Sequence, residues 1–209
     1  MAKIGLSKPY YAIYSNTGTT VTYSNGGVIG KYTEFSLELE DGDNNILYAD
    51  NGPAESDNSF AGGTATVTTD DLIAERMLAI LGLKKEAITE PALSTKDAYW
   101  LVFDDDQDTP YIGLGGIIKK KINNATKYQA FILTKIQFTN PGLEAVTQGE
   151  TIEWQTQELS ATIMRSDEAK ARWFMISNEL DSEEDAEKII KAHLNITDTP
   201  SRNTPAQGA

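Results

Sequence analysis

The chain has 209 residues and a formal net charge of -13, from 31 acidic and 18 basic side chains. This sign disfavours nucleic-acid binding by phosphate neutralisation, and the lack of cysteine excludes disulfides and thiolate metal sites. No apolar run approaches the roughly twenty residues that span a bilayer, and the first residues lack the apolar segment of a signal peptide. With 40% hydrophobic residues, the length predicts one large soluble β domain made in the cytosol rather than two small domains.

Two strands are predicted at the N-terminus. Residues 9–14 are short and aromatic, and residues 19–23 run into Ser24-Asn25-Gly26-Gly27. An Asn-Gly pair favours the positive φ angles of a tight turn. These two segments therefore predict an N-terminal hairpin.

A strict alternation over residues 31–40 predicts a half-buried strand. One face is apolar and carries Thr33, Phe35, Leu37 and Leu39. The other face carries Tyr32, Glu34, Ser36, Glu38 and Glu40. We expect the first face to contact the core and the second to present carboxylates.

Residues 41–59 interrupt the strands for too long to be an ordinary turn, and such interruptions are usually functional or disordered. The segment contains an apolar run, which a solvated linker does not need. We therefore expect a projecting arm that docks on a neighbour. Its candidate contact residues are Asp43, Asn44, Asn45, Ile46, Leu47 and Tyr48.

The next elements are a strand over residues 60–69 and a helix over about 71–81. Thr69, Asp70 and Asp71 are candidate N-caps, apolar residues recur at helical spacing, and Gly82 follows the last of them. Later strands are expected at residues 98–104, 111–120, 127–138, 151–164 and 171–176. The strands at 127–138 and 151–164 are long, which predicts a large sheet or an extension beyond the domain.

The C-terminal part predicts one more helix and a flexible tail. Residues 182–194 combine a capping-box pattern at Ser182 and Asp185 with an apolar stripe, so a short helix should dock there. Residues 196–209 are small, polar and proline-containing. They offer too little apolar surface to offset the entropy of ordering. We expect one folded domain over residues 1–195 and a mobile segment after it.

No residue pattern predicts catalysis, a cofactor or a metal. His193 is the single histidine, and we expect it on a helix surface. The acidic run 104–108 does not fit a calcium loop, because Thr109 and Gly115 occupy the positions that need Gly and Glu. Residues 113–116 lack the third glycine of a dinucleotide fingerprint and precede no helix. Glycines in that strand fit a close approach of backbones or a bulge instead.

Several segments resemble the major tail protein of long-tailed siphophages, the tail tube subunit. The resemblance runs to about Met175 and rests on these stretches: MAKIGLSKPYYAIYSN, YTEFSLELEDGDNNILYADNGPAESDNSFAGGTATVTTDDL, ILGL, YIGLGGIIKK, KYQAFILTKIQF and GETIEWQTQELSATI. The chain ends soon after its last predicted helix, so no appended immunoglobulin-like domain is expected. The resemblance rests on the order of these segments and on their amino-acid sequences, and it includes no catalytic signature.

The resemblance implies a β-sandwich or partly open barrel with a flanking helix, a long projecting loop and a short C-terminal helix. It also implies hexameric rings stacked into a tube in the virion tail, assembled in the host cytoplasm. The implied partners are a tape-measure protein and the tail terminator and tip proteins, while DNA transits the channel without specific binding. Glu34, Glu38 and Glu40 are the candidate lumen-facing residues. The other interpretation of this face is an ordinary solvated outer surface.

The main alternative is a β-sandwich module that binds a carbohydrate or a receptor. Such modules usually display aromatic side chains on loops or a flat face. Here Trp100, Trp154 and Trp173 all fall inside predicted strands, which indicates core or interface positions. An enzyme is a more distant alternative.

Overall fold

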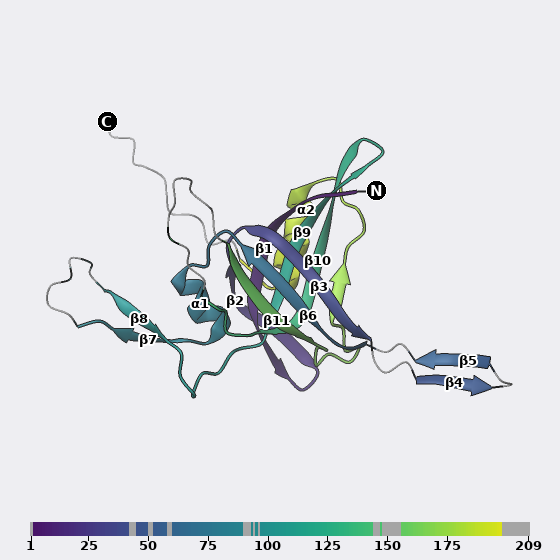
Figure 1. Ribbon diagram of the computed structural model, residues 1–209. Helices are drawn as coiled ribbons and strands as arrows, with labels where there is room; N and C mark the ends of the chain where they lie inside the picture. The colour runs from purple at the N-terminus through teal and green to yellow at the C-terminus, as the bar shows by residue number, and fades with distance from the viewer. Residues whose placement is uncertain are drawn as a thin grey trace.

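The computed structural model describes residues 2–41, 45–49, 52–57, 60–89, 93, 95, 97–143, 147 and 156–197. In this part of the chain the fold is mainly β, with one large antiparallel sheet and two short helices (Figure 1). Two-stranded ribbons project on either side of the sheet (Figure 1). The predicted fold class is therefore confirmed at the level of a mainly β protein with a flanking helix.

The large sheet has the strand order β2-β1-β9-β10-β11-β6-β3, and β12 pairs with β10. Its strands are β1 (Ala2–Thr17), β2 (Thr20–Val28), β3 (Tyr32–Asp41), β6 (Phe60–Thr69), β9 (Ile112–Ile122), β10 (Ala125–Phe138), β11 (Gln157–Met164) and β12 (Phe174–Ile176). The ribbons are β4 (Asn45–Ala49) with β5 (Gly52–Asp57), and β7 (Lys84–Ala87) with β8 (Tyr99–Val102). The helices are α1 (Ala74–Leu81) and α2 (Glu183–His193).

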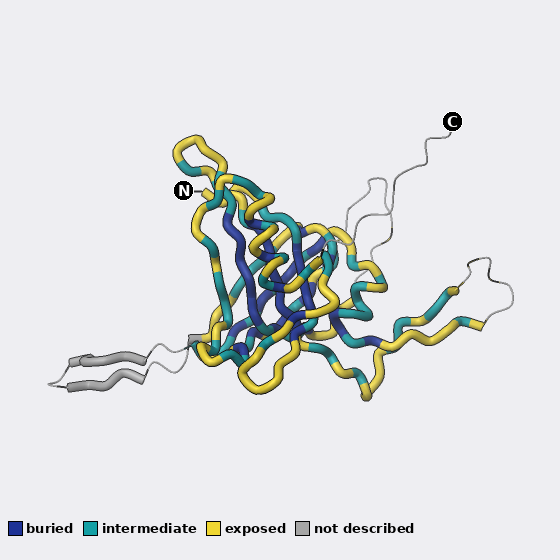
Figure 2. The backbone as a smooth tube through the Cα atoms, turned by 180° about the vertical axis from the view of Figure 1, so that it is seen from behind, coloured by how far each residue is buried: buried dark blue, intermediate teal, exposed yellow. Residues whose placement is uncertain are grey.

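The sheet curls so that β3 lies across from β9 and β10. The Phe35 ring of β3 stacks on Phe131 of β10 with 4.6 Å between centroids, and the Tyr32 hydroxyl donates to the Gly115 carbonyl of β9. The inner core takes buried side chains from β1, β3, β6, β9, β10 and β11 and from α1, which contributes Ile80 and Leu81. The dark blue strands of Figure 2 follow this core.

Strands β9 and β10 are buried on both faces. Phe131 and Leu133 of β10 point into the inner core, whereas Ala130 and Ile132 belong to a second apolar cluster beneath α2. A strand covered on both sides is apolar without interruption. This explains the run AFIL at residues 130–133, where a half-buried strand would alternate.

Glycines in β9 let α2 lie directly on the sheet. A Cβ atom at Gly115 would meet the Ile190 Cγ2 atom at 2.6 Å, and one at Gly113 would meet Leu194 Cδ2 at 2.7 Å. Ile190 and Leu194 are fully buried there. These glycines therefore make room for side chains of α2, whereas the sequence predicted a close approach of backbones or a bulge.

Replacing Gly115 by Ala should lower the free energy of unfolding by about 1–3 kcal/mol, because the added methyl group overpacks the contact with α2. Combining it with Ile190→Ala, which removes the opposing atoms, should cost less than the sum of the two single changes. Chemical denaturation of all three variants measures this coupling. Gly142→Ala is the control, because a Cβ there has nothing within 4 Å. Additivity to within about 0.5 kcal/mol would contradict the packing argument.

A charged contact fixes α2 to β1. The carboxylate of Glu187 accepts hydrogen bonds from Tyr10 at 2.5 Å and from Lys8, and it pairs with Lys191 at 2.6 Å. Burial alone would raise the pKa of Glu187, but these three partners outweigh it and lower the pKa to about 2. Ser182 caps the start of the helix by accepting from the Asp185 amide, as the sequence pattern predicts.

Glu187→Gln should lower the free energy of unfolding by about 2 kcal/mol near neutral pH, since a half-buried carboxylate loses charge-assisted hydrogen bonds. The folded pKa lies below the ordinary value of 4.5. The contribution is therefore complete above that value and is lost as the pH falls toward 2. Denaturation series at several pH values should show the two proteins converging in acid. The matched control is Glu184→Gln on the exposed side of α2, with an expected change below about 0.5 kcal/mol. A pH-independent difference would contradict this assignment.

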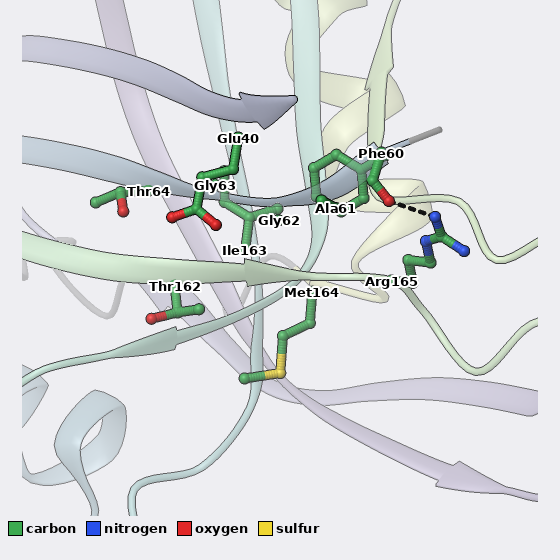
Figure 3. Close-up of a pocket in the computed structure, with 10 residues that line it drawn as sticks. All are labelled: Glu40, Phe60, Ala61, Gly62, Gly63, Thr64, Thr162, Ile163, Met164 and Arg165. Atoms are coloured by element: carbon green, nitrogen blue, oxygen red, sulfur yellow. Dashed lines mark hydrogen bonds between the residues drawn. The ribbon is translucent and has the colours of Figure 1, made fainter. Parts of the chain in front are cut away.

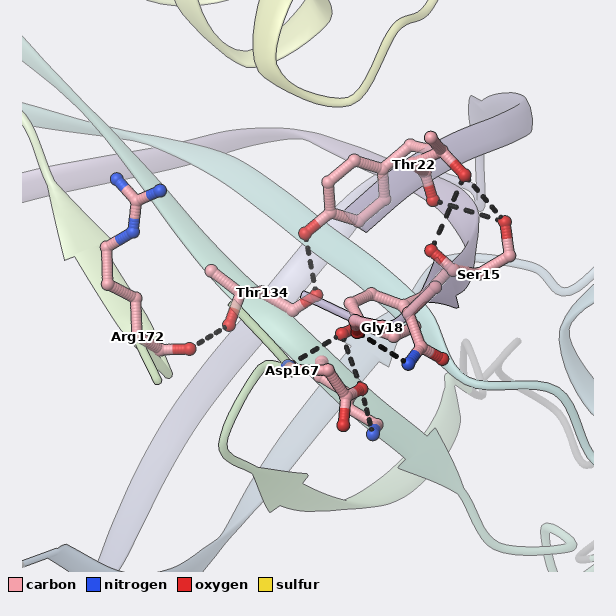
Figure 4. A network of polar contacts seen from close by, with 10 residues as sticks. Ser15, Gly18, Thr22, Thr134, Asp167 and Arg172 are labelled. Carbon is pink, nitrogen blue, oxygen red and sulfur yellow. Dashed lines mark hydrogen bonds and ion pairs between the residues drawn. The ribbon is translucent and has the colours of Figure 1, made fainter. Parts of the chain in front are cut away.

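The β1–β2 hairpin is tied to the other strands by polar contacts (Figure 4). The Tyr23 hydroxyl donates to the Thr134 carbonyl, and the Thr134 hydroxyl donates to the Arg172 carbonyl (Figure 4). The Tyr14 hydroxyl donates to Asp167, which also accepts from Lys135 at 2.7 Å. These bonds hold the segment before β12 against β10.

Several sequence predictions need correction. The α1 helix begins at Ala74 after Ile73, with no side-chain cap, because Asp70 instead accepts from the backbone amides of Lys31 and Asp71. Its end at Gly82 is confirmed, with a left-handed φ of 67°. The sequence predicts a strand at residues 98–104, which corresponds to β8, but it does not predict β7 or the pairing of the two strands. The first strand is much longer than residues 9–14 and spans Ala2–Thr17.

Candidate functional site

The carboxylates predicted on the third strand lie on its outer side. Glu34, Glu38 and Glu40 are all exposed, and Phe35 and Leu37 turn toward the core. Tyr32 departs from the predicted alternation and is buried, because the register shifts between Tyr32 and Glu34. Leu39, predicted in the core, is 46% exposed near the end of the strand.

These carboxylates belong to a polar surface that crosses three strands, which we call the β3–β6–β11 outer face. Residues directly opposite in an antiparallel pair share a face. The rows are Glu34–Thr68–Glu158, Ser36–Thr66–Ser160 and Glu38–Thr64–Thr162, with Glu40 opposite Gly62. The same strands place Val67, Ala65 and Leu159 on the inner side, fully buried.

Carboxylates and hydroxyl groups make up this face. It carries Glu34, Glu38, Glu40 and Glu158, and its other side chains are those of serine and threonine. Within the strands that form it, no lysine, arginine or aromatic residue occupies these positions. These strand positions therefore combine negative charge with small polar groups and present no cation to a phosphate.

A groove of about 650 Å³ lies at one end of this face (Figure 3). Glu40, Thr64 and Thr162 line it on the polar side, and Arg165 donates to the Phe60 carbonyl at its margin (Figure 3). The Phe60 ring stacks on Trp173 with 4.2 Å between centroids. The base of the projecting arm is thus anchored on an aromatic contact beside the groove.

The arm is a separate antiparallel ribbon beyond the end of β3 (Figure 1). Asn45, Ile46, Leu47 and Tyr48 all belong to β4, which pairs with β5. Asp43 and Asn44 lie outside the described residues, as do residues 198–209 of the predicted tail. The projection beyond the sheet agrees with the sequence prediction, while the docking of these residues stays a prediction.

The second ribbon, β7–β8, presents an aromatic side chain that sequence reasoning placed in the core or an interface. Trp100 is 62% exposed, whereas Trp173 packs against the inner core; Trp154 lies outside the described residues. Lys85 lies over the Tyr99 ring at 4.3 Å. In the described part of the chain, this ribbon pairs with no further strand.

The sheet leaves two strand edges facing each other, which we call the β1–β3 seam. Among the described strands, β3 pairs only with β6, so its other edge has no partner. Strand β1 pairs with β2 only from its residue Tyr10 onward, so the first part of β1 has no partner on that edge. A groove of about 330 Å³ lies between these edges, lined by Lys3, Ile4, Gly5, Leu6, Thr33, Glu34, Phe35 and Ile118. Unpaired backbone groups at such edges favour pairing with another chain.

The residues examined as candidates for catalysis or metal binding do not lie together in one site. His193 packs on the Tyr23 ring at 5.5 Å, and burial lowers its pKa. Asp104 pairs with Lys84 at 2.9 Å. Among the described residues, no group of three or more His, Asp or Glu side chains is arranged to hold a metal.

No protein-family model matches the chain, and no curated protein matches it either. Neither helix in the described part of the chain has the length and apolarity to cross a membrane. The functional assignment therefore depends on the surfaces described above and on the sequence itself.

Proposed function

We propose that this chain is the tail tube subunit, or major tail protein, of a long-tailed siphophage. In this role it polymerises as hexameric rings stacked into a tube, and the tube forms the channel for DNA ejection. One observation carries the proposal: the curled sheet is covered by α2 on one side and presents an uncovered carboxylate and hydroxyl surface on the other.

The β3–β6–β11 outer face suits the wall of a DNA channel. Duplex DNA carries one negative charge per roughly 1.7 Å of axis, so lysines along a channel would hold it. Carboxylates repel the phosphates, and serine and threonine hydroxyls carry no charge that would attract them. Glu34, Glu38 and Glu40 would form rings of negative charge when repeated around the tube.

The unpaired edges and ribbons support assembly with other copies. The β1–β3 seam and both ribbons leave backbone groups available for strand pairing between subunits. A closed ring of subunits removes such edges. Trp100 on β8 adds an exposed aromatic side chain that a subunit contact would bury.

The same proposal assigns the chain to the virion tail, after assembly in the host cytoplasm. Its partners would be further copies of itself, a tape-measure protein inside the tube, and terminator and tip proteins at the ends. The role is structural, without catalysis or a cofactor, and DNA passes without specific binding.

The exposure of Trp100 also fits the alternative of a β-sandwich module that binds a carbohydrate or receptor. Sizing and negative-stain microscopy of the purified chain separate the two functions. Rings or tubes support the tail tube, while a compact monomer that binds a glycan supports the binding module.

The arm provides a direct test. Replacing Ile46, Leu47 and Tyr48 by Ser should leave a folded monomer that does not polymerise, because burying each large side chain contributes about 1.5 kcal/mol or more. Circular dichroism checks the fold, and sedimentation with microscopy measures polymerisation. The matched control replaces three exposed apolar residues away from the arm, Ile73, Leu143 and Ile189, by Ser and should polymerise normally. Normal tubes from the first variant would rule out docking through this run.

The lumen assignment predicts the effect of charge reversal. Replacing Glu34, Glu38 and Glu40 by Lys should preserve the fold, because all three are exposed, and should slow genome ejection several-fold by attracting phosphates. The slowing should be greatest at low ionic strength, because screening acts over a Debye length of about 8 Å at physiological salt.

The control for charge reversal changes three exposed carboxylates elsewhere, Glu75, Asp105 and Glu184, to Lys. It alters net charge equally and should leave ejection unaffected. If the β3–β6–β11 outer face lies on the outside of the tube, ejection by the first variant stays normal and only the electrophoretic mobility of whole tails shifts. That result would exclude the lumen assignment.

A further inference from the structure

The end of α2 and the residues just after it rest on the β1–β2 hairpin, and we call residues 193–196 the C-terminal clasp. Two members of the clasp contact one residue of the hairpin. The His193 ring lies 5.5 Å from the Tyr23 ring between centroids, and the Asn195 side-chain amide donates to the Tyr23 carbonyl at 3.1 Å. The clasp therefore joins the end of the helix to β2.

The other two members of the clasp are apolar and fill spaces beside glycines. Leu194 is fully buried, and an added Cβ atom at Gly113 would lie 2.7 Å from it. An added Cβ atom at Gly26 of β2 would lie 2.5 Å from Ile196 Cγ1. Any movement of the clasp therefore exposes apolar surface that the closed form covers.

His193 is in the clasp with one ring nitrogen shielded from water. In the described part of the chain, no hydrogen-bond partner reaches its Nε2 atom, which is buried. In a neutral imidazole this nitrogen can be the one without a proton, but in a protonated histidine both ring nitrogens are donors. A buried donor without an acceptor is costly, most of all when it is charged. The closed clasp therefore favours the neutral form of His193.

The charged and titratable groups around the His193 ring come from three other elements. Arg172, in the segment between β11 and β12, is a cation, and Glu168 of the same segment pairs with it at 2.5 Å. Tyr23 of β2 and Tyr14 of β1 stay neutral in acid, because burial raises the pKa of both. Burial and then the charge of Arg172 lower the pKa of His193 below its ordinary 6.5, and Glu168 opposes them only in part.

The other polar attachment of α2 keeps its charge in the same pH range. Six residues before His193, and so about 9 Å along the helix axis, Glu187 accepts from Tyr10 and Lys8. Its pKa is lowered to about 2, so it remains ionised in mild acid. Mild acid should therefore act on the end of α2 and leave the attachment to β1 in place.

We propose that His193 is an acid-sensitive switch whose protonation releases the C-terminal clasp from the β1–β2 hairpin. Release lets the new N–H group reach water and moves its charge away from Arg172. It also uncovers Leu194 and Ile196 at one end of the helix-covered side. The switch is a property of the folded subunit and does not depend on the tail tube proposal.

The direction of the pH effect follows from the lowered pKa of His193. Because that pKa lies below the ordinary value of 6.5 while the clasp is closed, the closed form binds fewer protons than the open form. The clasp is fully stable above 6.5 and weakens as the pH falls below it. Each further unit of pH raises the open population about tenfold until the closed form itself is protonated.

Amide hydrogen exchange of the full-length chain, corrected for the intrinsic rate at each pH, measures the release. The reporters are the Leu194 and Ile196 amides, which donate to the carbonyls of Ile190 and Lys191, both at 2.9 Å. Between about pH 7.5 and about pH 5 they should lose protection about tenfold or more, while amides of β10 keep theirs. Since His193 is the single histidine, its ring protons report its own titration by NMR, and the midpoint should lie below 6.5.

Two variants separate protonation from packing. His193→Phe keeps a ring against Tyr23 but accepts no proton, so protection should not change over this pH range. Arg172→Gln removes the nearby cation and keeps the backbone carbonyl that accepts from Thr134 (Figure 4), so the midpoints of titration and release should both rise. The matched control is Lys170→Gln, an exposed cation of the same segment, whose midpoints should equal those of the unmodified chain.

Three results would overturn the switch. The first is a loss of protection in His193→Phe equal to that of the unmodified chain. The second is protection that persists while His193 titrates, and the third is an unchanged midpoint in Arg172→Gln. None of these results bears on the tail tube proposal, which polymerisation tests.

Discussion

The close packing of α2 on β9 determines which side of the sheet is covered and which is exposed to solvent. Gly113 and Gly115 leave room for Leu194 and Ile190, so the helix packs directly on the outer side of β9. Glu187 then fixes the helix to Lys8 and Tyr10. Since the helix covers only the β1, β9 and β10 half, the β3, β6 and β11 half keeps its outer side open to solvent. That open side is where carboxylates and hydroxyl groups alternate with core residues.

Because α2 covers one half of the sheet only, the two outer sides of the molecule differ in charge and polarity. A subunit with one helix-covered side and one acidic side suits a wall, with different surfaces inside and outside. Its two ribbons project from the sheet, and its unpaired strand edges lie along the β1–β3 seam. This difference between the two sides arises from how residues alternate along the strands and from where α2 packs.

Local signals in the sequence predicted much of this fold. Gly82 ends α1 and Ser182 caps α2 as expected, because both act through the backbone next to them. The alternation in residues 33–38 predicted the exposed Glu34 and Glu38, but the register shift after Tyr32 depends on pairing with β6 and left no local sign. The β7–β8 ribbon escaped prediction because KKEA shows no alternation of apolar residues. Trp100 is exposed because that ribbon projects from the large sheet, and strand propensity alone does not predict such a projection.

The central claim is that the uncovered acidic side of the sheet lines a channel. Electron cryomicroscopy of the assembled protein tests it most directly, because strand positions in a reconstruction identify which side faces the axis. The account predicts a hollow tube of stacked rings with β3, β6 and β11 toward the lumen and α2 on the outside. A tube with α2 facing the lumen, or a purified chain that forms no rings or tubes at all, would contradict it.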